Sequence, residues 1–219
     1  MADLYLYQLR VVLRDVSPLV WRRLLMSSET SIAQLHEILQ LTFDWSGEHL
    51  HRFRIHGRDY GSPLCGGITF DEDAQQVPLS RFCLHDGERF RYEYDFTAGW
   101  VLDVRLEQIL PWDAKRSVPM CTGGSRAAPP EDCAGARDYL ERLNRHRHEW
   151  PMDDLALMAE TLQRFLDCGG DRKALGNREE LCDAVDRVTA YQDFQPQRFD
   201  RRQANRQLQA LRQDRRVQP

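Results

Sequence analysis

The chain has 219 residues, of which 42% are hydrophobic and 29% are charged, and its formal net charge at pH 7 is −4. This composition is typical of a folded globular protein and excludes disordered and fibrous classes. No apolar run reaches the ~18 residues of a membrane span, and the N-terminus has no signal-peptide pattern, so we expect a cytoplasmic protein without a membrane partner. In that compartment the cysteines are expected to be thiols. They are Cys65, Cys83, Cys121, Cys133, Cys168 and Cys182.

Three extended segments are predicted in the first part of the chain. Residues 4–13 and 19–26 alternate apolar and polar side chains, and the turn at Ser17-Pro18 makes them antiparallel partners. Residues 49–57 form the third segment. Residues 57–75, which follow it, have the composition of a loop.

One helix is predicted between these segments. Ser31, followed three positions later by Gln34, fits a capping box, which predicts a helix that runs to about Phe43. Its expected buried positions follow the helical period and are Leu35, Ile38, Leu39 and either Thr42 or Phe43.

The clearest pattern is the alternation in ERFRYEYDF, residues 88–96. Aromatic and charged side chains point to opposite faces, and apolar positions resume after the short loop 97–99, which predicts a β-hairpin with one buried side. The aromatic positions are Phe90, Tyr92, Tyr94 and Phe96, and the charged ones are Arg89, Arg91, Glu93 and Asp95. The later apolar positions are Trp100, Leu102, Val104 and Leu106.

Helical periodicity replaces this alternation after Pro111. Strands followed by helices predict an α+β fold, an antiparallel meander or barrel-like sheet packed with helices. Residues 1–135 are expected to form the sheet core with one N-terminal helix. Residues 136–219 are expected to pack on that core as a helical segment of the same domain, ending in a basic helix. The predicted helices are 136–148, 152–167, 177–190 and 200–213.

Several motifs, taken together in chain order, resemble one known family. They are PLVWRRLL, LHEILQLTFDW, HLHRFRI, YEYDF with a following Trp, GGSRAAPPEDCAG and FQPQRFDRRQANRQL. The sequence resembles the Ri-plasmid ORF-3-like family, whose members include insertion-sequence passenger proteins labelled TnpR. The resemblance implies an α+β fold on an antiparallel sheet and an association with mobile elements, and it implies no activity.

The chain departs from the family pattern in its hairpin and in its proline segment. The family hairpin usually reads Tyr-Asp-Phe-Gly-Asp-x-Trp-x-His, whereas here Tyr94-Asp95-Phe96 is followed by Thr97-Ala98, and Leu102 replaces the histidine. Ala128 replaces a cysteine that often precedes the two prolines. Any chemistry that depended on the missing Asp and His is expected to be lost.

A metal site is one hypothesis for the stretch CTGGSRAAPPEDC. Cys121 and Cys133 are too far apart for a zinc-knuckle half-site, so an ion would need both of them and two histidines from elsewhere. His49 and His51 are the candidates, because positions two apart on a strand share a face. The alternatives are hydrogen-bonded core histidines and a rigid corner in which Gly123-Gly124 turn the chain. Apart from this divalent metal, no cofactor is expected.

Glu93 and Asp95 are the catalytic candidates. Paired carboxylates can perform acid–base chemistry or bind a divalent ion. A solvated face with salt bridges to Arg105 across the hairpin is the alternative.

The C-terminal segment is strongly basic and amphipathic. Ala204, Leu208 and Leu211 have helical spacing, which predicts either a helix docked on the domain or a nucleic-acid-binding tail. Because 28 of the 30 basic residues are arginine, a general arginine bias weakens the second interpretation. The candidate nucleic-acid contacts are Arg198, Arg201, Arg202, Arg206, Arg212, Arg215 and Arg216.

These patterns leave several functions open. The first is a non-enzymatic accessory protein that binds a protein or nucleic acid through the sheet's polar face or the basic tail. The second is a metal-dependent enzyme built on the His, Asp and Cys candidates. Serine-recombinase chemistry is disfavoured despite the TnpR label, because Ser17 lies in a predicted turn and no doubly wound α/β pattern is present.

Overall fold

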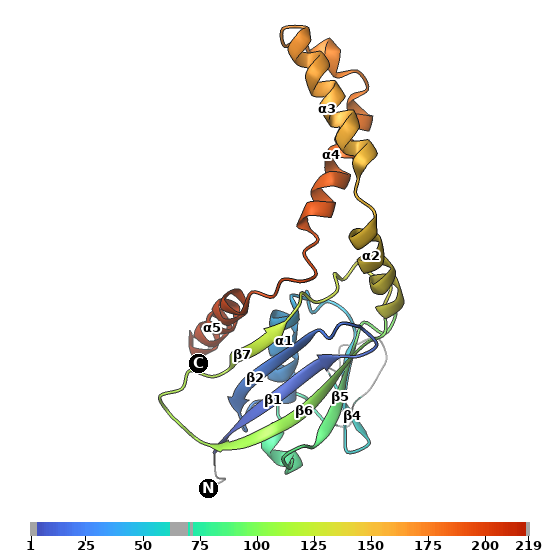
Figure 1. Cartoon of the computed structure of the whole chain (residues 1–219). Helices are drawn as coiled ribbons and strands as arrows, with labels where there is room; N and C mark the ends of the chain where they lie inside the picture. The colour runs from blue at the N-terminus through green and yellow to red at the C-terminus, as the bar shows by residue number, and fades with distance from the viewer. Residues whose placement is uncertain (1–3, 62–69, 71, 218–219) are drawn as a thin grey trace. The chain divides into compact units, whose positions relative to one another are not determined.

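The computed structural model of the chain describes residues 4–61, 70 and 72–217, with side chains up to residue 213 (Figure 1). The chain divides into two compact units. The first comprises Met1–Leu140 together with Gln197–Pro219 and contains the sheet, and the second comprises Glu141–Pro196 and is helical.

Seven strands form one open antiparallel sheet in the described part of the first unit, in the order β4-β3-β5-β6-β1-β2-β7. The predicted α+β fold is therefore confirmed, with an open sheet rather than a barrel. β4 lies in a segment expected to be a loop, and it pairs with β3 as a short hairpin. The bounds are β1 (Tyr5–Leu13), β2 (Trp21–Ser27), β3 (His51–Ile55), β4 (Arg58–Tyr60), β5 (Arg89–Tyr94), β6 (Trp100–Pro111) and β7 (Met120–Ser125).

Alternation along the strands gives the sheet one apolar and one polar face. On β5, Phe90, Tyr92 and Tyr94 are buried, whereas Arg89 and Arg91 are exposed, as the sequence pattern predicts. The apolar face lies against helix α1 (Ile32–Phe43), behind the strands in Figure 1. We call the opposite side the open face. Its charged side chains are partly or fully exposed and are Arg10, Arg23, Arg52, Arg54, Arg89, Arg91, Glu93, Asp103, Arg105 and Glu107.

Helix α1 begins and ends where its local sequence predicts. Ser31 Oγ accepts a hydrogen bond from the Gln34 amide at 3.2 Å, and Gln34 Oε1 accepts one from the Ser31 amide at 3.1 Å, so both halves of the capping box form. The helix ends at Asp44, whose φ of 56° is left-handed. All five positions named as candidates for burial are buried.

Strand β7 corrects the expectation that Gly123-Gly124 turn the chain. Both glycines lie within the strand and pair with β2. Gly124 is required by packing, because a Cβ atom there would lie 2.3 Å from Cε1 of Phe199. Gly124 therefore makes room for a side chain from far along the chain.

Helix α5 (Arg201–Val217) is docked on β7 in the same unit. Ala204 and Leu208 are buried, and the Asn205 amide group bonds the backbone N–H and C=O of Cys121 at 2.8 and 2.9 Å. The buried Arg22 guanidinium lies 3.8 Å from the Phe199 ring centroid. The amphipathic helix predicted for the tail thus packs as part of the first unit.

The second unit is helical, as its sequence predicts. α3 (Met152–Asp167), the 3₁₀ turn η2 (Arg172–Leu175) and α4 (Arg178–Asp193) lie within it, while α2 (Ala136–His148) begins in the first unit and continues into the second. The Asn177 side chain caps α4 by accepting a hydrogen bond from the Glu180 amide. Across the described ranges, the search for a helix long and apolar enough to cross a membrane finds none.

The described cysteines are free thiols, as expected. Cys121 and Cys133 are buried, and Cys83, Cys168 and Cys182 are exposed. Cys65 lies outside the described residues.

Candidate functional site

Four side chains from three elements form a buried polar cluster on the apolar face of the sheet. Tyr92 comes from β5, His51 from β3, and His36 and Gln40 lie one turn apart on α1. The imidazole rings of His36 and His51 stack with their centroids 3.6 Å apart and an angle of 7° between their planes. The Tyr92 hydroxyl lies 2.7 Å from His36 Nδ1 and accepts a hydrogen bond of 2.6 Å from Gln40 Nε2. We call these four residues the histidine–tyrosine cluster.

Both histidines of the cluster are neutral at pH 7. Burial, with a smaller contribution from the neighbouring His51, lowers the pKa of His36 to about 3. Burial alone lowers the pKa of His51 to about 4. His36 Nδ1 and the Tyr92 hydroxyl share one hydrogen bond, whose direction depends on the tautomer of the neutral imidazole. Imidazoles this weakly basic are poor general bases at neutral pH, so the cluster serves to hold α1 against the sheet.

A second hydrogen-bonded group ties the proline segment to the loop after α1. The Tyr94 hydroxyl donates to Glu131 Oε1 at 2.6 Å, and Ser46 donates to the same carboxylate through its amide at 2.8 Å and its hydroxyl at 3.0 Å. The Trp45 indole N–H donates to the carbonyl oxygen of Pro129 at 2.9 Å. Burial, together with the bond to Glu131, raises the pKa of Tyr94. These bonds fix the corner between the sheet and α2.

Two of the predicted metal ligands, His51 and Cys121, lie on strands near opposite edges of the sheet. His51 on β3 is buried in the cluster, and the exposed His49 precedes that strand, with its ring 5.7 Å from that of Tyr94. Cys121 lies on β7, at the far edge of the sheet, and Cys133 is buried before α2. Over the described residues, no three His, Cys, Asp or Glu side chains are grouped closely enough to hold a metal ion. The metal hypothesis stays a prediction.

Glu93 and Asp95 have structural partners. Glu93 lies opposite Val101 and forms an ion pair with Arg52 Nη2 at 2.6 Å, so its predicted salt bridge to Arg105 is wrong. Asp95 has a left-handed φ of 47°, and its Oδ1 accepts the amide hydrogens of Thr97 and Ala98 in the following turn. Because β5 ends at Tyr94, the alternation stops there, and Phe96 is 37% exposed rather than buried. A catalytic role for the two carboxylates stays a prediction.

The candidate arginines of the tail lie along a docked helix and the segment before it. Arg198, Arg201, Arg202 and Arg206 are exposed, and Arg212 is partly exposed. Arg201 Nη1 donates to the carbonyl oxygen of Thr122 at 3.0 Å, so one of these side chains also fastens α5 to β7. The side chains of Arg215 and Arg216 lie outside the described residues.

The open face carries four arginines in register on four adjacent strands. Arg89 on β5 lies opposite Arg105 on β6, Arg105 lies opposite Arg10 on β1, and Arg10 lies opposite Arg23 on β2. Neighbouring strands lie about 4.8 Å apart, so the four Cα positions span about 14 Å. We call this set the arginine row.

The arginine row has little counter-charge from the fold. Glu107 binds Arg23 through two hydrogen bonds of 2.6 and 3.0 Å. Arg10, Arg89 and Arg105 have no carboxylate within 4.0 Å among the described residues. Arg10 Nε is buried without a hydrogen-bond partner in the described ranges. The row is therefore a line of positive charge with one acidic partner at its β2 end.

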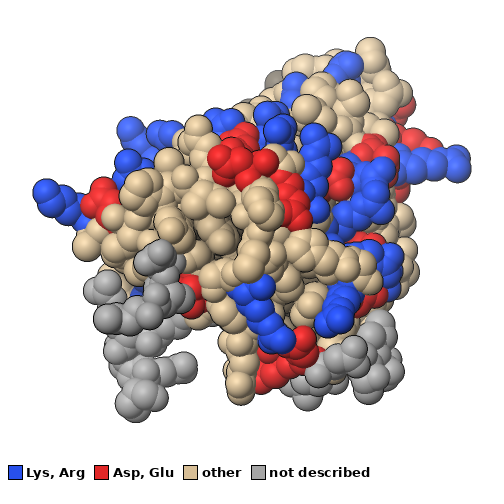
Figure 2. All heavy atoms as spheres, turned by 90° about the horizontal axis from the view of Figure 1, so that it is seen from below, with Lys and Arg blue, Asp and Glu red and all other residues tan. Residues whose placement is uncertain are grey.

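Other arginines of the same face are paired. Arg54 Nε lies 2.8 Å from Asp59 Oδ1, and Arg52 is shared between Asp59 and Glu93. Figure 2 shows basic and acidic side chains interspersed over the side of the molecule seen from below. The arginine row, in which Arg23 alone has an ion-pair partner among the described residues, is thus a local feature of four strands.

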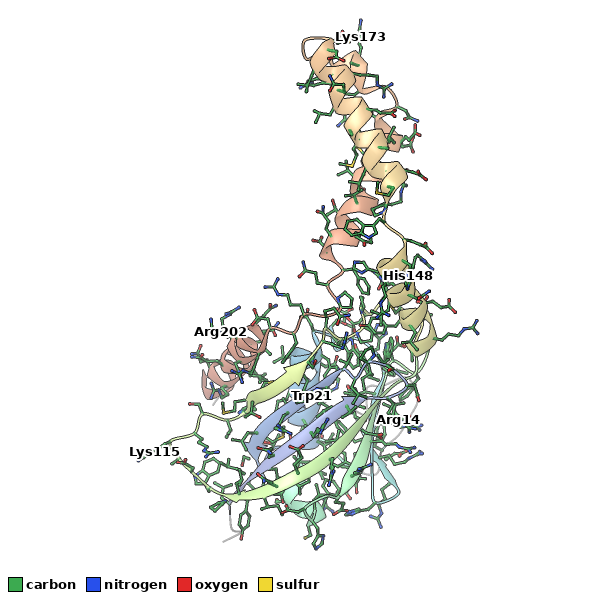
Figure 3. The ribbon with its side chains drawn as sticks, in the orientation of Figure 1. Arg14, Trp21, Lys115, His148, Lys173 and Arg202 are labelled. Atoms are coloured by element: carbon green, nitrogen blue, oxygen red, sulfur yellow. The ribbon has the colours of Figure 1, made fainter. Side chains whose placement is uncertain are left out.

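Trp21, labelled in Figure 3, lies beside the arginine row on β2, next to the edge strand β7. Its ring centroid is 5.2 Å from the Arg10 guanidinium carbon and 5.6 Å from that of Arg23. The Trp21 indole also lies against Gly123 on β7, where a Cβ would make an ordinary contact of 3.4 Å with ring atom Cη2. The row and its neighbouring indole combine positive charge with a partly exposed aromatic surface.

Sequence reasoning missed His36 and the arginine row. The available signal for His36 was its position four residues before Gln40, beside the apolar stripe of α1. The row had no local signal, because its members lie on four strands whose register is set by long-range pairing.

Comparison with known proteins places the chain in a family. The model of the plasmid pRiA4b ORF-3-like protein family matches residues 5–203. The chain belongs to this family. A relative, Uncharacterized protein y4hQ of Sinorhizobium fredii (strain NBRC 101917 / NGR234), is 31% identical over 189 residues, which cover 84% of this chain and 92% of the relative.

A solved structure of similar fold supports the architecture of this ORF-3-like protein. It is the crystal structure of a protein of unknown function, MM3350 from Methanosarcina mazei Go1. The TM-score is 0.65 and the identity 27%, with 92% of this chain and 97% of that chain covered. None of these descriptions names an activity, so functional inference depends on the residues of the site.

Proposed function

We propose that this protein is a non-enzymatic accessory module that binds nucleic acid through its open face. The observation that carries the proposal is the arginine row, in which three of four guanidinium groups lack a carboxylate partner among the described residues. The TnpR resemblance adds an association with mobile elements to the same proposal.

Electrostatics explain why such a row points to an anionic ligand. Like charges directly opposite one another on antiparallel strands destabilise a sheet by about 0.2–1 kcal/mol per pair. The fold contains three such pairs in succession, and among the described residues Glu107 is the one carboxylate that forms an ion pair with a member of the row. A ligand that supplies negative charges along the line removes this repulsion when it binds.

A phosphate backbone fits the row better than an acidic protein partner. Arginine forms bidentate hydrogen bonds with phosphate oxygens, and a nucleic-acid strand repeats its charge at regular steps along a line. The partly exposed Trp21 beside the row adds an aromatic surface. Since the net charge of the chain is −4, the long-range interaction with a polyanion is repulsive, and binding is expected to depend on these local contacts.

The test is the salt dependence of oligonucleotide binding. Fluorescence anisotropy of a labelled strand of about 12 nucleotides would be measured at several salt concentrations. If three arginines contact phosphates of a single strand, a plot of log K against the logarithm of the salt concentration should have a slope of about −2. The double variant Arg89→Gln/Arg105→Gln removes two of these contacts and should reduce the magnitude of the slope by about 1.4.

Arg54→Gln is the matched control, since Arg54 lies on the same face but is paired with Asp59. We expect it to leave the slope unchanged. Absence of binding at low salt, or a slope that the double variant does not alter, would contradict the proposal. Row-dependent binding of an acidic peptide without oligonucleotide binding would favour a protein partner instead.

A further inference from the structure

We infer that the open face takes single-stranded nucleic acid, with one base stacked on Trp21 and the adjacent phosphates on the arginine row. This inference rests on the proposed function and specifies its ligand.

The surroundings of Trp21 differ from those of the other sheet-associated tryptophans. Trp45 and Trp100 are 5% and 1% exposed and belong to the core. The Trp45 indole N–H is bonded to Pro129, and that of Trp100 is buried without a partner in the described ranges. The Trp21 indole N–H also has no hydrogen-bond partner among the described residues, but its ring is partly exposed. Trp21 therefore offers a ligand both a partly exposed ring and an N–H donor.

The position of Trp21 couples base stacking to phosphate binding. Arg10 and Arg23, at the β1 and β2 positions of the arginine row, lie within 6 Å of its ring centroid. A base stacked over this indole would have its own phosphate beside these two guanidinium groups. The next phosphates of an extended strand would then follow the row toward Arg105 and Arg89.

The exposed aromatic ring favours single strands over duplexes. Bases within a duplex are stacked on one another, whereas those of a single strand are free to stack on an aromatic side chain. The open face is built from strands, and no helix projects from the four strands of the row in the described part of the first unit. Duplex recognition through an inserted helix is therefore not available there.

The experiment compares three labelled probes of equal length: a mixed-sequence single strand, its duplex, and an abasic strand that keeps the phosphates. Wild-type protein should bind the single strand about tenfold more tightly than either of the others. Trp21→Leu should weaken binding of the single strand about tenfold and change abasic binding less than twofold. Trp21→Tyr, which keeps a stackable ring, should restore affinity to within about threefold of wild type. Trp112→Leu is the control, since Trp112 is 40% exposed and lies beyond the end of β6.

The outcomes separate this inference from the proposed function. Equal binding of all three probes, with loss in the Arg89→Gln/Arg105→Gln variant, would overturn the single-strand inference and leave the proposed function standing. Absence of row-dependent binding to any probe would overturn both. Ultraviolet crosslinking of the wild-type complex provides a measurement that needs no variant. Crosslinks to the peptide containing Trp21 support the inference, and crosslinks confined to other peptides contradict it.

Discussion

The two faces of the sheet differ in whether their polar and charged groups have partners. On the apolar face, the hydroxyl of Tyr92 joins His36 and Gln40, and Tyr94 joins Glu131, so most polar atoms there have partners. On the open face, Arg89 and Arg105 oppose each other across adjacent strands without a carboxylate partner in the described ranges. The comparison teaches that residues directly adjacent on β5 serve different ends: stability on one face and, in our proposal, ligand binding on the other.

The largest expected effect is a loss of stability on removing a buried polar group from the apolar face. Tyr92→Phe removes the hydroxyl that joins His36 Nδ1 and Gln40 Nε2, and each buried group left unpaired costs about 1–3 kcal/mol. We expect a loss of about 2–4 kcal/mol in the free energy of unfolding, measured by urea denaturation. Tyr60→Phe is the control, because its hydroxyl has no hydrogen bond with the described residues. Equal losses in the two variants would show that the cluster is not a principal source of stability.

The pH dependence of stability provides a second test of the buried polar groups on the apolar face. The pKa values of His36 and His51 are lowered to about 3 and about 4, so the unfolded chain takes up protons below about pH 6.5 while the folded chain does not. Stability should therefore be greatest near neutral pH and fall as the pH decreases from 6.5 toward 4. The limiting slope for two protons is about 2.7 kcal/mol per pH unit.

A phenylalanine in place of one histidine tests this assignment. His51→Phe keeps an aromatic ring in the stack but removes one titrating group, so denaturation midpoints should change about half as steeply over the same pH interval. His148→Gln is the control, because that side chain is exposed (Figure 3). An unaltered pH profile for His51→Phe would contradict the burial of neutral histidines.

A variant of the arginine row should affect binding and stability in opposite directions. Arg105→Gln removes two like-charge pairs, with Arg89 and Arg10, so the free energy of unfolding should stay equal or rise by about 0.2–1 kcal/mol. Oligonucleotide affinity should fall about threefold to tenfold. Thermal denaturation and anisotropy on the same preparation provide both values. A variant that loses stability along with affinity would assign Arg105 to the fold rather than to a ligand.

The smallest effect is expected from the tail. Arg202→Gln (labelled in Figure 3) with Arg206→Gln removes two exposed charges from α5. The helix is held in place through Leu208 and Asn205 instead. We expect less than a twofold loss of oligonucleotide affinity and no change in the denaturation midpoint. A loss larger than that of the Arg89→Gln/Arg105→Gln variant would move the principal phosphate contacts to α5.

Local sequence was sufficient for elements whose signals are local. The capping box at Ser31 and the alternation of β5 up to Tyr94 each depend on residues within one element, and each appears as predicted. Strand β7 could not be predicted in this way. Its Gly124 is explained by Phe199, which lies far along the chain.

The candidate site was less predictable than the fold for the same reason. Metal ligands were proposed from spacing along the chain, but His51 and Cys121 lie on strands near opposite edges of the sheet. The arginine row depends on the register of β1 with both neighbours, which includes an irregularity between Gln8 and Leu9. Nothing in the sequence near Arg10 or Arg105 indicates that these residues face each other.

Nitrogen-15 NMR of the full-length protein during titration with a single strand of about 12 nucleotides tests the central claim most directly. The account predicts chemical-shift changes in the Trp21 indole N–H and in the side-chain Nε–H groups of Arg10, Arg23, Arg89 and Arg105. The indole signals of the core residues Trp45 and Trp100 should stay unchanged. Shift changes confined to α5 or to the histidine–tyrosine cluster, with the arginine row unaffected, would contradict it.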